Sequence, residues 1–297
     1  MFKVQGSSTW NLELGTWNPE RRARGFTLVE MIVVIAITGI LAGAVAVFIR
    51  RPVEGYVDAA RRAELTDIAD TALRRITRDL RTALPNSVRT TIVGNVRYIE
   101  YLQTSGGGRY RSELMSDPSD PNYPGNILNF IAADASFDVI GTMPALAAGN
   151  SIVIYNLSPT GSTANAYSGD NRGAYSSNTA TTITLFPAKL FPYQSPGKRF
   201  QVVEHAVTYA CDPVGAKTVR RIAGYAIQPA QPNDVAAPPL STAPSNALLA
   251  RNITGCSFTY TATGPTARTG VLALDLQVEQ AGEKVRLFQQ VHVNNVP

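Results

Sequence analysis

Histidine and cysteine are scarce in this sequence of 297 residues, which contains two of each. The histidines, His205 and His292, lie in strand-like runs, and neither has a cysteine, a second histidine or an acidic residue at metal-ligand spacing. Glu204 precedes His205 directly, so the two side chains would point to opposite faces of a strand. No G-x-S-x-G motif, phosphate-binding loop or paired-cysteine motif occurs in the sequence. We therefore expect no catalytic residue, no metal site and no cofactor.

Charged residues make up only 16% of the chain and hydrophobic residues 44%, which is typical of a globular body of one or two domains. The net charge of +5 falls to +3 if residues 1–25, with four basic and two acidic side chains, are removed. Nucleic-acid-binding domains usually carry a stronger basic excess. We therefore expect no nucleic-acid partner.

One long segment contains no charged side chain. Residues 31–49 read MIVVIAITGILAGAVAVFI and are bounded by Glu30 and Arg50. Counted from Phe26, the apolar run is about 24 residues, or about 36 Å of helix, which exceeds the roughly 30 Å hydrocarbon layer of a bilayer. An ordinary secretory signal has a shorter apolar region with a small-x-small cleavage site beyond it. Residues 26–49 are therefore predicted to form a transmembrane helix.

Basic residues flank this span on both sides, so the positive-inside rule is nearly balanced. The short segment before the span is easily left in the cytoplasm, whereas the long body after it contains both cysteines, Cys211 and Cys256. On this topology the cysteines lie outside the cytoplasm, where an oxidising compartment favours a disulfide between them. The alternative is two unpaired, buried thiols.

Glu30 is an ionisable group at the margin of the span. A carboxylate in a membrane segment costs on the order of 2.5 to 3.5 kcal/mol on insertion scales, so it usually has a partner or a function. The alternative is that its side chain reaches the headgroups at the cytoplasmic face.

The residues around Glu30 resemble the type III signal of type IV pilins and pseudopilins. Residues 24–31 read RGFTLVEM, and in that signal a basic leader ends in glycine and the mature phenylalanine is followed four residues later by glutamate. The resemblance implies that a prepilin peptidase cleaves between Gly25 and Phe26, removes residues 1–25 and N-methylates the Phe26 amine. It also implies that Glu30 pairs with the first amine of a neighbouring subunit in a helical filament.

The same resemblance implies a single-pass protein of the inner membrane with a periplasmic C-terminal domain. The implied partners are the prepilin peptidase, other major and minor pilin subunits, the inner-membrane assembly platform and membrane lipid. Gly39 and Gly43 form a G-x-x-x-G motif that permits close helix contact, or they are incidental glycines of the kind common in membrane helices.

An amphipathic pattern follows the span. Apolar residues recur every three or four positions from Leu65 to Leu84, and Pro85 ends the pattern. Residues 50–84 are therefore predicted to form a stalk helix that continues the span. The six arginines from Arg61 to Arg81 could hold an acidic neighbour or lipid headgroups, but interleaved acidic residues favour a solvated face.

Beyond Pro85 the pattern changes to strands and turns, so we predict an α+β fold. A long N-terminal helix, made of span and stalk, packs on an antiparallel β-sheet body at residues 85–297. Ser105 to Gly108 predict a hairpin turn, with Tyr110 in the return strand. Residues 158–179 and 229–244 are rich in Ser, Asn, Gly, Ala and Pro and predict surface loops. Runs rich in Val, Ile, Thr, Tyr or Phe predict strands at 96–102, 151–156, 181–186, 200–210, 219–227, 257–261, 271–279 and 284–293.

Residues 75–89 and the terminal hairpin at 271–297 resemble minor subunits of the mannose-sensitive haemagglutinin (MSHA) pilus and, more distantly, J-type minor pseudopilins of type II secretion. This resemblance implies a subunit that primes or caps filament assembly at the tip. The alternatives are a pseudopilin of a type II secretion system, a tip subunit that binds a surface or an exported substrate, and a membrane-tethered enzyme. An enzyme would need a cleft with convergent ionisable groups.

Overall fold

The computed structural model describes residues 25–262 and 268–297, so the predicted leader lies outside the described residues except for Gly25. The chain divides into two compact units, Met1–Tyr56 and Val57–Pro297. One helix, α1 (Leu28–Leu80), contributes residues to both units.

In the first unit, the described residues after Thr27 are all helical. Every side chain from Met31 to Ile49 is exposed, and the most apolar stretch of α1 has a mean hydropathy of 2.9. The helix continues through Pro52, although proline removes one helical hydrogen bond. α1 is the one helix of the described residues that is long and apolar enough to cross a membrane.

In the second unit, the last turns of α1 are amphipathic. The buried face consists of small and branched apolar side chains at helical spacing, which pack on the sheets. α1 ends at Leu80, earlier than residue 84, because the chain turns there toward strand β2 (Val96–Tyr110). The Leu84 amide donates to the Leu102 carbonyl over 2.8 Å. The buried positions are Leu65, Ala69, Ala72, Leu73, Ile76 and Leu80.

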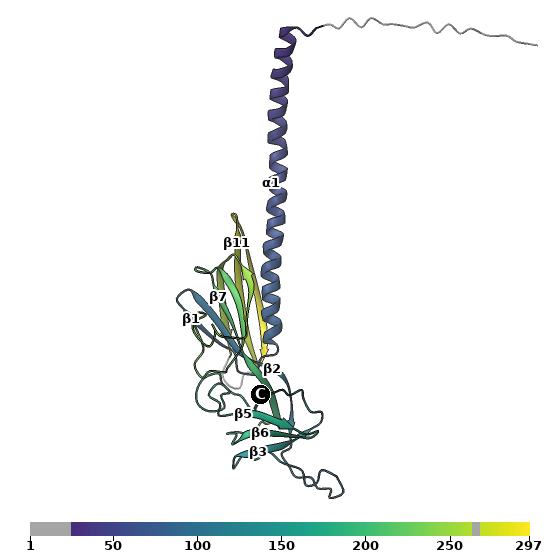
Figure 1. Ribbon diagram of the computed structural model, residues 1–297, viewed down its shortest axis with the longest axis vertical. Coiled ribbons are helices and arrows are strands. Elements are labelled where there is room, and N and C mark those ends of the chain that lie inside the picture. Colours follow the sequence, from purple (N-terminus) through teal and green to yellow (C-terminus); the bar gives the residue numbers. More distant parts are fainter. Residues whose placement is uncertain (1–24, 263–267) are drawn as a thin grey trace, which may run out of the picture. The chain divides into compact units, whose positions relative to one another are not determined.

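The body contains two antiparallel sheets, which confirms the predicted α+β fold. The larger sheet has the strand order β1-β2-β3-β6-β5-β4-β7-β8-β9, and β2 also pairs directly with β7. Figure 1 shows β7 and β11 (Thr269–Gln280) near the C-terminal turns of α1, with β3, β5 and β6 grouped at the other end of the body. The strands of the larger sheet are β1 (Arg89–Val93), β2 (Val96–Tyr110), β3 (Asp134–Ile140), β4 (Ser151–Val153), β5 (Arg172–Asn178), β6 (Thr182–Lys189), β7 (Arg199–Asp212), β8 (Thr218–Tyr225) and β9 (Ser245–Arg251).

The smaller sheet consists of β10 (Ile253–Thr261), β11 (Thr269–Gln280) and β12 (Glu283–Asn294), in that order. Residues on alternate positions of β11 are fully buried, as expected for a strand with one face on a core. A single hydrophobic cluster joins α1, the larger sheet and the smaller sheet. Its members include Leu65, Ile76, Ile99, Tyr209, Val219, Phe258, Leu274 and Leu276.

The predicted hairpin turn at Ser105 to Gly108 is wrong. β2 runs through these residues to Tyr110, with Gly107 opposite Gln201 and Gly108 opposite Phe200 of β7. A β-carbon on Gly107 would lie 2.6 Å from the Phe200 carbonyl oxygen, and one on Gly108 would lie 2.8 Å from the Phe200 ring. These glycines therefore permit a close approach of two strands instead of a reversal.

Four strands were not predicted: β1, β3, β5 and β9. β5 lies inside the segment predicted as a loop at 158–179, whereas the loop predicted at 229–244 contains no strand. β5 reads RGAYSSN and has few of the branched and aromatic residues that mark a strand.

A disulfide joins Cys211 of β7 to Cys256 of β10 and so links the two sheets, which confirms the predicted pairing. Both cysteines are buried in the cluster shared by α1 and the sheets. We expect a thiol reagent to label no cysteine of the denatured, non-reduced chain and both cysteines after reduction. Mass spectrometry of the labelled protein measures this, and labelling of both residues without reduction would contradict the pairing.

Candidate functional site

The first turn of α1 contains the carboxylate singled out by the sequence. Thr27 directly precedes the helix, and its hydroxyl oxygen accepts a hydrogen bond from the Glu30 amide over 3.2 Å. In return, the Thr27 amide donates to the Glu30 carboxylate over 3.4 Å. This reciprocal arrangement is a capping box, in which two otherwise unpaired helix amides gain acceptors.

Glu30 therefore has a structural role within one subunit that was not predicted from the sequence. Its signal was present as Thr-x-x-Glu immediately before an apolar run. A carboxylate in the first turn is also favoured by the helix dipole. Glu30 is exposed and forms no ion pair with any residue in 25–262 or 268–297, so its charge remains accessible to a cation from outside this part of the chain.

The residues around the predicted cleavage point are open. Gly25 and Phe26 precede the helix, and Phe26 is 77% exposed. A β-carbon on Gly25 would meet nothing within 4 Å, and the same holds for Gly39 and Gly43 farther along α1. In the described structure, the predicted cleavage point and the two helix glycines are therefore sterically free for contact with another protein.

A buried aspartate fastens the last turn of α1 to the larger sheet. The Asp79 carboxylate accepts from Arg221 Nε of β8 over 2.6 Å and from the Tyr209 hydroxyl of β7 over 2.8 Å. Arg75 Nε lies 3.1 Å from its second oxygen. Burial raises the pKa of Tyr209, and the contact with Asp79 raises it further, so the phenol keeps the proton that it donates.

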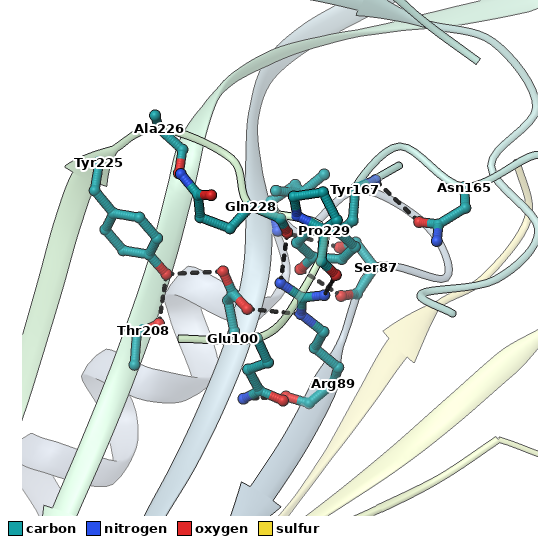
Figure 2. A network of polar contacts seen from close by, with 12 residues as sticks. Ser87, Arg89, Glu100, Asn165, Tyr167, Thr208, Tyr225, Ala226, Gln228 and Pro229 are labelled. Atoms are coloured by element: carbon teal, nitrogen blue, oxygen red, sulfur yellow. Dashed lines mark hydrogen bonds and ion pairs between the residues drawn. The ribbon is translucent and has the colours of Figure 1, made fainter. Parts of the chain in front are cut away.

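A second buried network holds β1 and β2 against the loop after β8. Arg89 Nε donates to Glu100 over 2.6 Å, and its two terminal nitrogens donate to the carbonyls of Gln228 and Pro229 over 2.9 and 2.7 Å. Figure 2 shows the Tyr225 hydroxyl on the other side of the Glu100 carboxylate, at 2.9 Å. Both oxygens of this fully buried carboxylate therefore have donors.

An aromatic ring completes the environment of Arg89. The Arg89 guanidinium carbon lies 3.6 Å from the centre of the Tyr167 ring, a distance at which a cation is attracted to the ring face. Tyr167 is itself fixed by a hydrogen bond of 2.8 Å from its hydroxyl to the Ser87 carbonyl. The network is complete within one subunit and serves to hold the fold.

The two histidines lie on strands of different sheets. His205 lies half-buried on β7, where burial lowers its pKa, and His292 is exposed on β12. Within residues 25–262 and 268–297, no group of three or more His, Cys, Asp or Glu side chains could hold a metal ion.

Comparison with known proteins locates one match, at the start of α1. Residues 21–46 match the prokaryotic N-terminal methylation motif, a type IV pilin-like signal. No curated protein and no solved structure matches the chain. Such a motif implies processing by prepilin peptidase and association with other pilin subunits. Together with the apolar part of α1, the motif supports a single-pass anchor in the inner membrane and a type IV pilin-like role in pilus or secretion assembly.

Proposed function

We propose that this chain is a minor pilin or pseudopilin that primes or caps a filament at its tip. The observation that carries the proposal is the position of the methylation motif, which covers Gly25, Phe26 and Glu30 at the start of α1. Cleavage after Gly25 would leave the Phe26 amine two residues before the first helical residue, on an exposed end that a neighbouring subunit can reach.

The proposed assembly contact is an ion pair between the Glu30 carboxylate and the Phe26 amine of a neighbour. A carboxylate and an ammonium are each costly among apolar helices, but the cost falls when the two groups meet in good geometry. Glu30 is suited to this contact for two reasons. The capping box holds its carboxylate at the helix end, and no cation of the described residues pairs with that carboxylate. The contact would set the register between the two subunits that it joins.

The remaining domain assignments are part of the same proposal. Residues 1–25 would be the cytoplasmic leader, residues 26–49 the span, residues 50–84 the stalk and residues 85–297 a periplasmic body. The disulfide between Cys211 and Cys256 supports an exported body, because structural disulfides persist in oxidising compartments.

The filament system is proposed from the resemblance of residues 75–89 and 271–297 to minor MSHA pilus subunits. The two sheets and twelve strands of the described residues make a large body for a filament subunit, which suits an end position where fewer neighbours restrict its size. The type II secretion pseudopilus is the second candidate system, on the more distant resemblance to J-type pseudopilins.

Mass spectrometry of the chain from cells with an active prepilin peptidase tests the proposed processing. We expect a mature form that begins with N-methylated Phe26. Gly25→Leu should keep its leader, because a bulky side chain blocks the close backbone approach that cleavage needs. Thr38→Ser, a conservative change inside α1, serves as the control and should be processed normally. A wild-type chain that retains residues 1–25 in such cells would contradict the proposal.

A further inference from the structure

One exposed face of the stalk carries charges separated by sign. Six side chains spaced three and four residues apart lie on it, and we call this face the charged stripe. Its first two members are acidic, its third is a threonine and its last three are basic. They are Glu64, Asp67, Thr71, Arg74, Arg78 and Arg81, and all are exposed.

The two ends of the charged stripe are not neutralised by the described part of their own subunit. Arg74 pairs with Asp70 at 2.6 Å. Neither acidic member of the stripe forms an ion pair with residues 25–262 or 268–297, and neither does Arg78 or Arg81. Unpaired acids thus lie at one end of the stripe and unpaired bases at the other.

The basic end of the charged stripe borders an open groove of about 970 Å³. Arg74, Arg78 and Arg81 line one wall. The strands contribute Leu249 from β9 and Leu287, Phe288 and Gln289 from β12, and the Phe288 side chain is 62% exposed. The groove therefore fits a helix that has carboxylates beside apolar side chains.

We propose that this groove binds the acidic end of the charged stripe of a second copy of this chain, an inference that rests on the proposed function in a filament. The midpoint of Glu64 and Asp67 is 14 residues from that of Arg78 and Arg81, or about 21 Å along a helix. Two parallel copies offset by this distance bring opposite charges together. Copies side by side at one level would place like charges opposite each other, so the stripe selects the staggered arrangement.

The acidic end of the second copy also carries apolar side chains, which could contact Phe288 in the groove of the first copy. The stripe continues toward the N-terminus through Ala60 and Val57, which are both exposed. They lie one and two turns before Glu64, so a helix seated with its acids on Arg78 and Arg81 also presents apolar side chains toward the groove. Burial of Phe288 by these residues would add a favourable apolar term.

The contact joins two different patches, so each pair of copies leaves one groove and one acidic end free. Interfaces of this kind are open and can propagate along an axis. The charged stripe would therefore hold two or more copies of this chain in stagger within the complex that starts the filament.

Photo-cross-linking of the full-length chain in cells that assemble filaments tests the contact. We would place p-benzoylphenylalanine at Phe288 in one tagged copy and detect cross-links to a second copy with a different tag. Arg78→Glu with Arg81→Glu in both copies should reduce the yield at least about tenfold, because the groove would then face like charges. Glu64→Arg with Asp67→Arg in both copies should reduce it equally. A mixture of the two double variants should restore the yield. In the mixed pair, the acidic groove of one copy faces the basic residues 64 and 67 of the other, and the basic groove of the second copy faces Glu64 and Asp67 of the first.

A matched control changes charge away from the groove. Arg251→Glu with Lys217→Glu alters the net charge by the same amount at exposed positions outside the groove and should leave the yield unchanged. Yields that ignore the stripe variants, a failure of the mixed pair to recover, or cross-links to a different protein in place of the second copy would each overturn the proposal. The mature N-terminus is measured on the same samples, and its absence would count against the proposed function alone.

Discussion

Replacement of Glu30 by alanine should leave cleavage after Gly25 intact and reduce incorporation into filaments by a factor of about 100 or more. An unpaired charge buried among apolar helices costs about 3–5 kcal/mol, which corresponds to that factor. In the Glu30→Ala subunit, the Phe26 amine of the neighbour would lose its carboxylate. The measurement compares the amount of mature chain in the membrane with the amount in sheared, purified filaments.

The capping box makes a second variant necessary, because Glu30 also stabilises its own helix. Glutamine occupies this position of a capping box as well as glutamate does, but it carries no charge. If ion pairing is the role of Glu30, Glu30→Gln should be as defective in incorporation as Glu30→Ala. Thr27→Val removes the capping hydroxyl and keeps the carboxylate, so it should be incorporated much better than either. Normal incorporation of Glu30→Gln would contradict the pairing.

Replacement of Arg89 by alanine should lower the free energy of unfolding by about 3–5 kcal/mol, because it leaves the buried Glu100 carboxylate without its cation. The variant also loses donors to the carbonyls of Gln228 and Pro229 and the contact with the Tyr167 ring. Denaturant unfolding of the detergent-solubilised chain measures the difference. Arg286→Ala removes an exposed pair with Asp275 and should cost about 0–1 kcal/mol, so it is the matched control.

The loss of stability in Arg89→Ala should depend on pH, in a direction set by the pKa of Glu100. Burial raises the pKa of Glu100 above its ordinary value of 4.5, while the Arg89 charge opposes this rise. A carboxyl with a raised pKa binds more protons in the folded state, so stability falls as pH rises from 4.5 through the folded pKa. Removing Arg89 raises the folded-state pKa of Glu100 further, so the pH interval over which stability falls becomes wider. The stability difference between Arg89→Ala and wild type should therefore be smaller at about pH 4 than at about pH 7, and an equal difference at both would contradict the burial of a charged Glu100.

The sequence predicted those parts of the fold that depend on short-range patterns. The apolar run from Met31, the buried spacing from Leu65 to Leu80 and the alternation in β11 each follow from local periodicity. The glycines of β2 could not be placed in the same way. Their role depends on the Phe200 backbone and ring, which are distant in the sequence and become neighbours only when β2 and β7 pair.

The signal around Glu30 was predictable from the sequence, whereas the hydrogen-bond and ion-pair partners of Glu30 and Glu100 were only partly predictable. Glu30 could be singled out because a charge beside an apolar run is costly, whereas its capping partner Thr27 was overlooked. Glu100 alternates with Tyr98 and Leu102 in the sequence, and a charge among apolar neighbours indicates a buried partner. Nothing in the local pattern identifies that partner as Arg89, because it depends on the pairing of β1 with β2.

Recovery of this chain in filaments tests the account most directly. Filaments sheared from cells, or pseudopili released from cells that overproduce them, would be purified and analysed for this chain and for its N-terminal residue. The account predicts that the chain is present in the filament fraction and begins at Phe26. Filaments that assemble normally while the whole of this chain stays in the membrane fraction would contradict it.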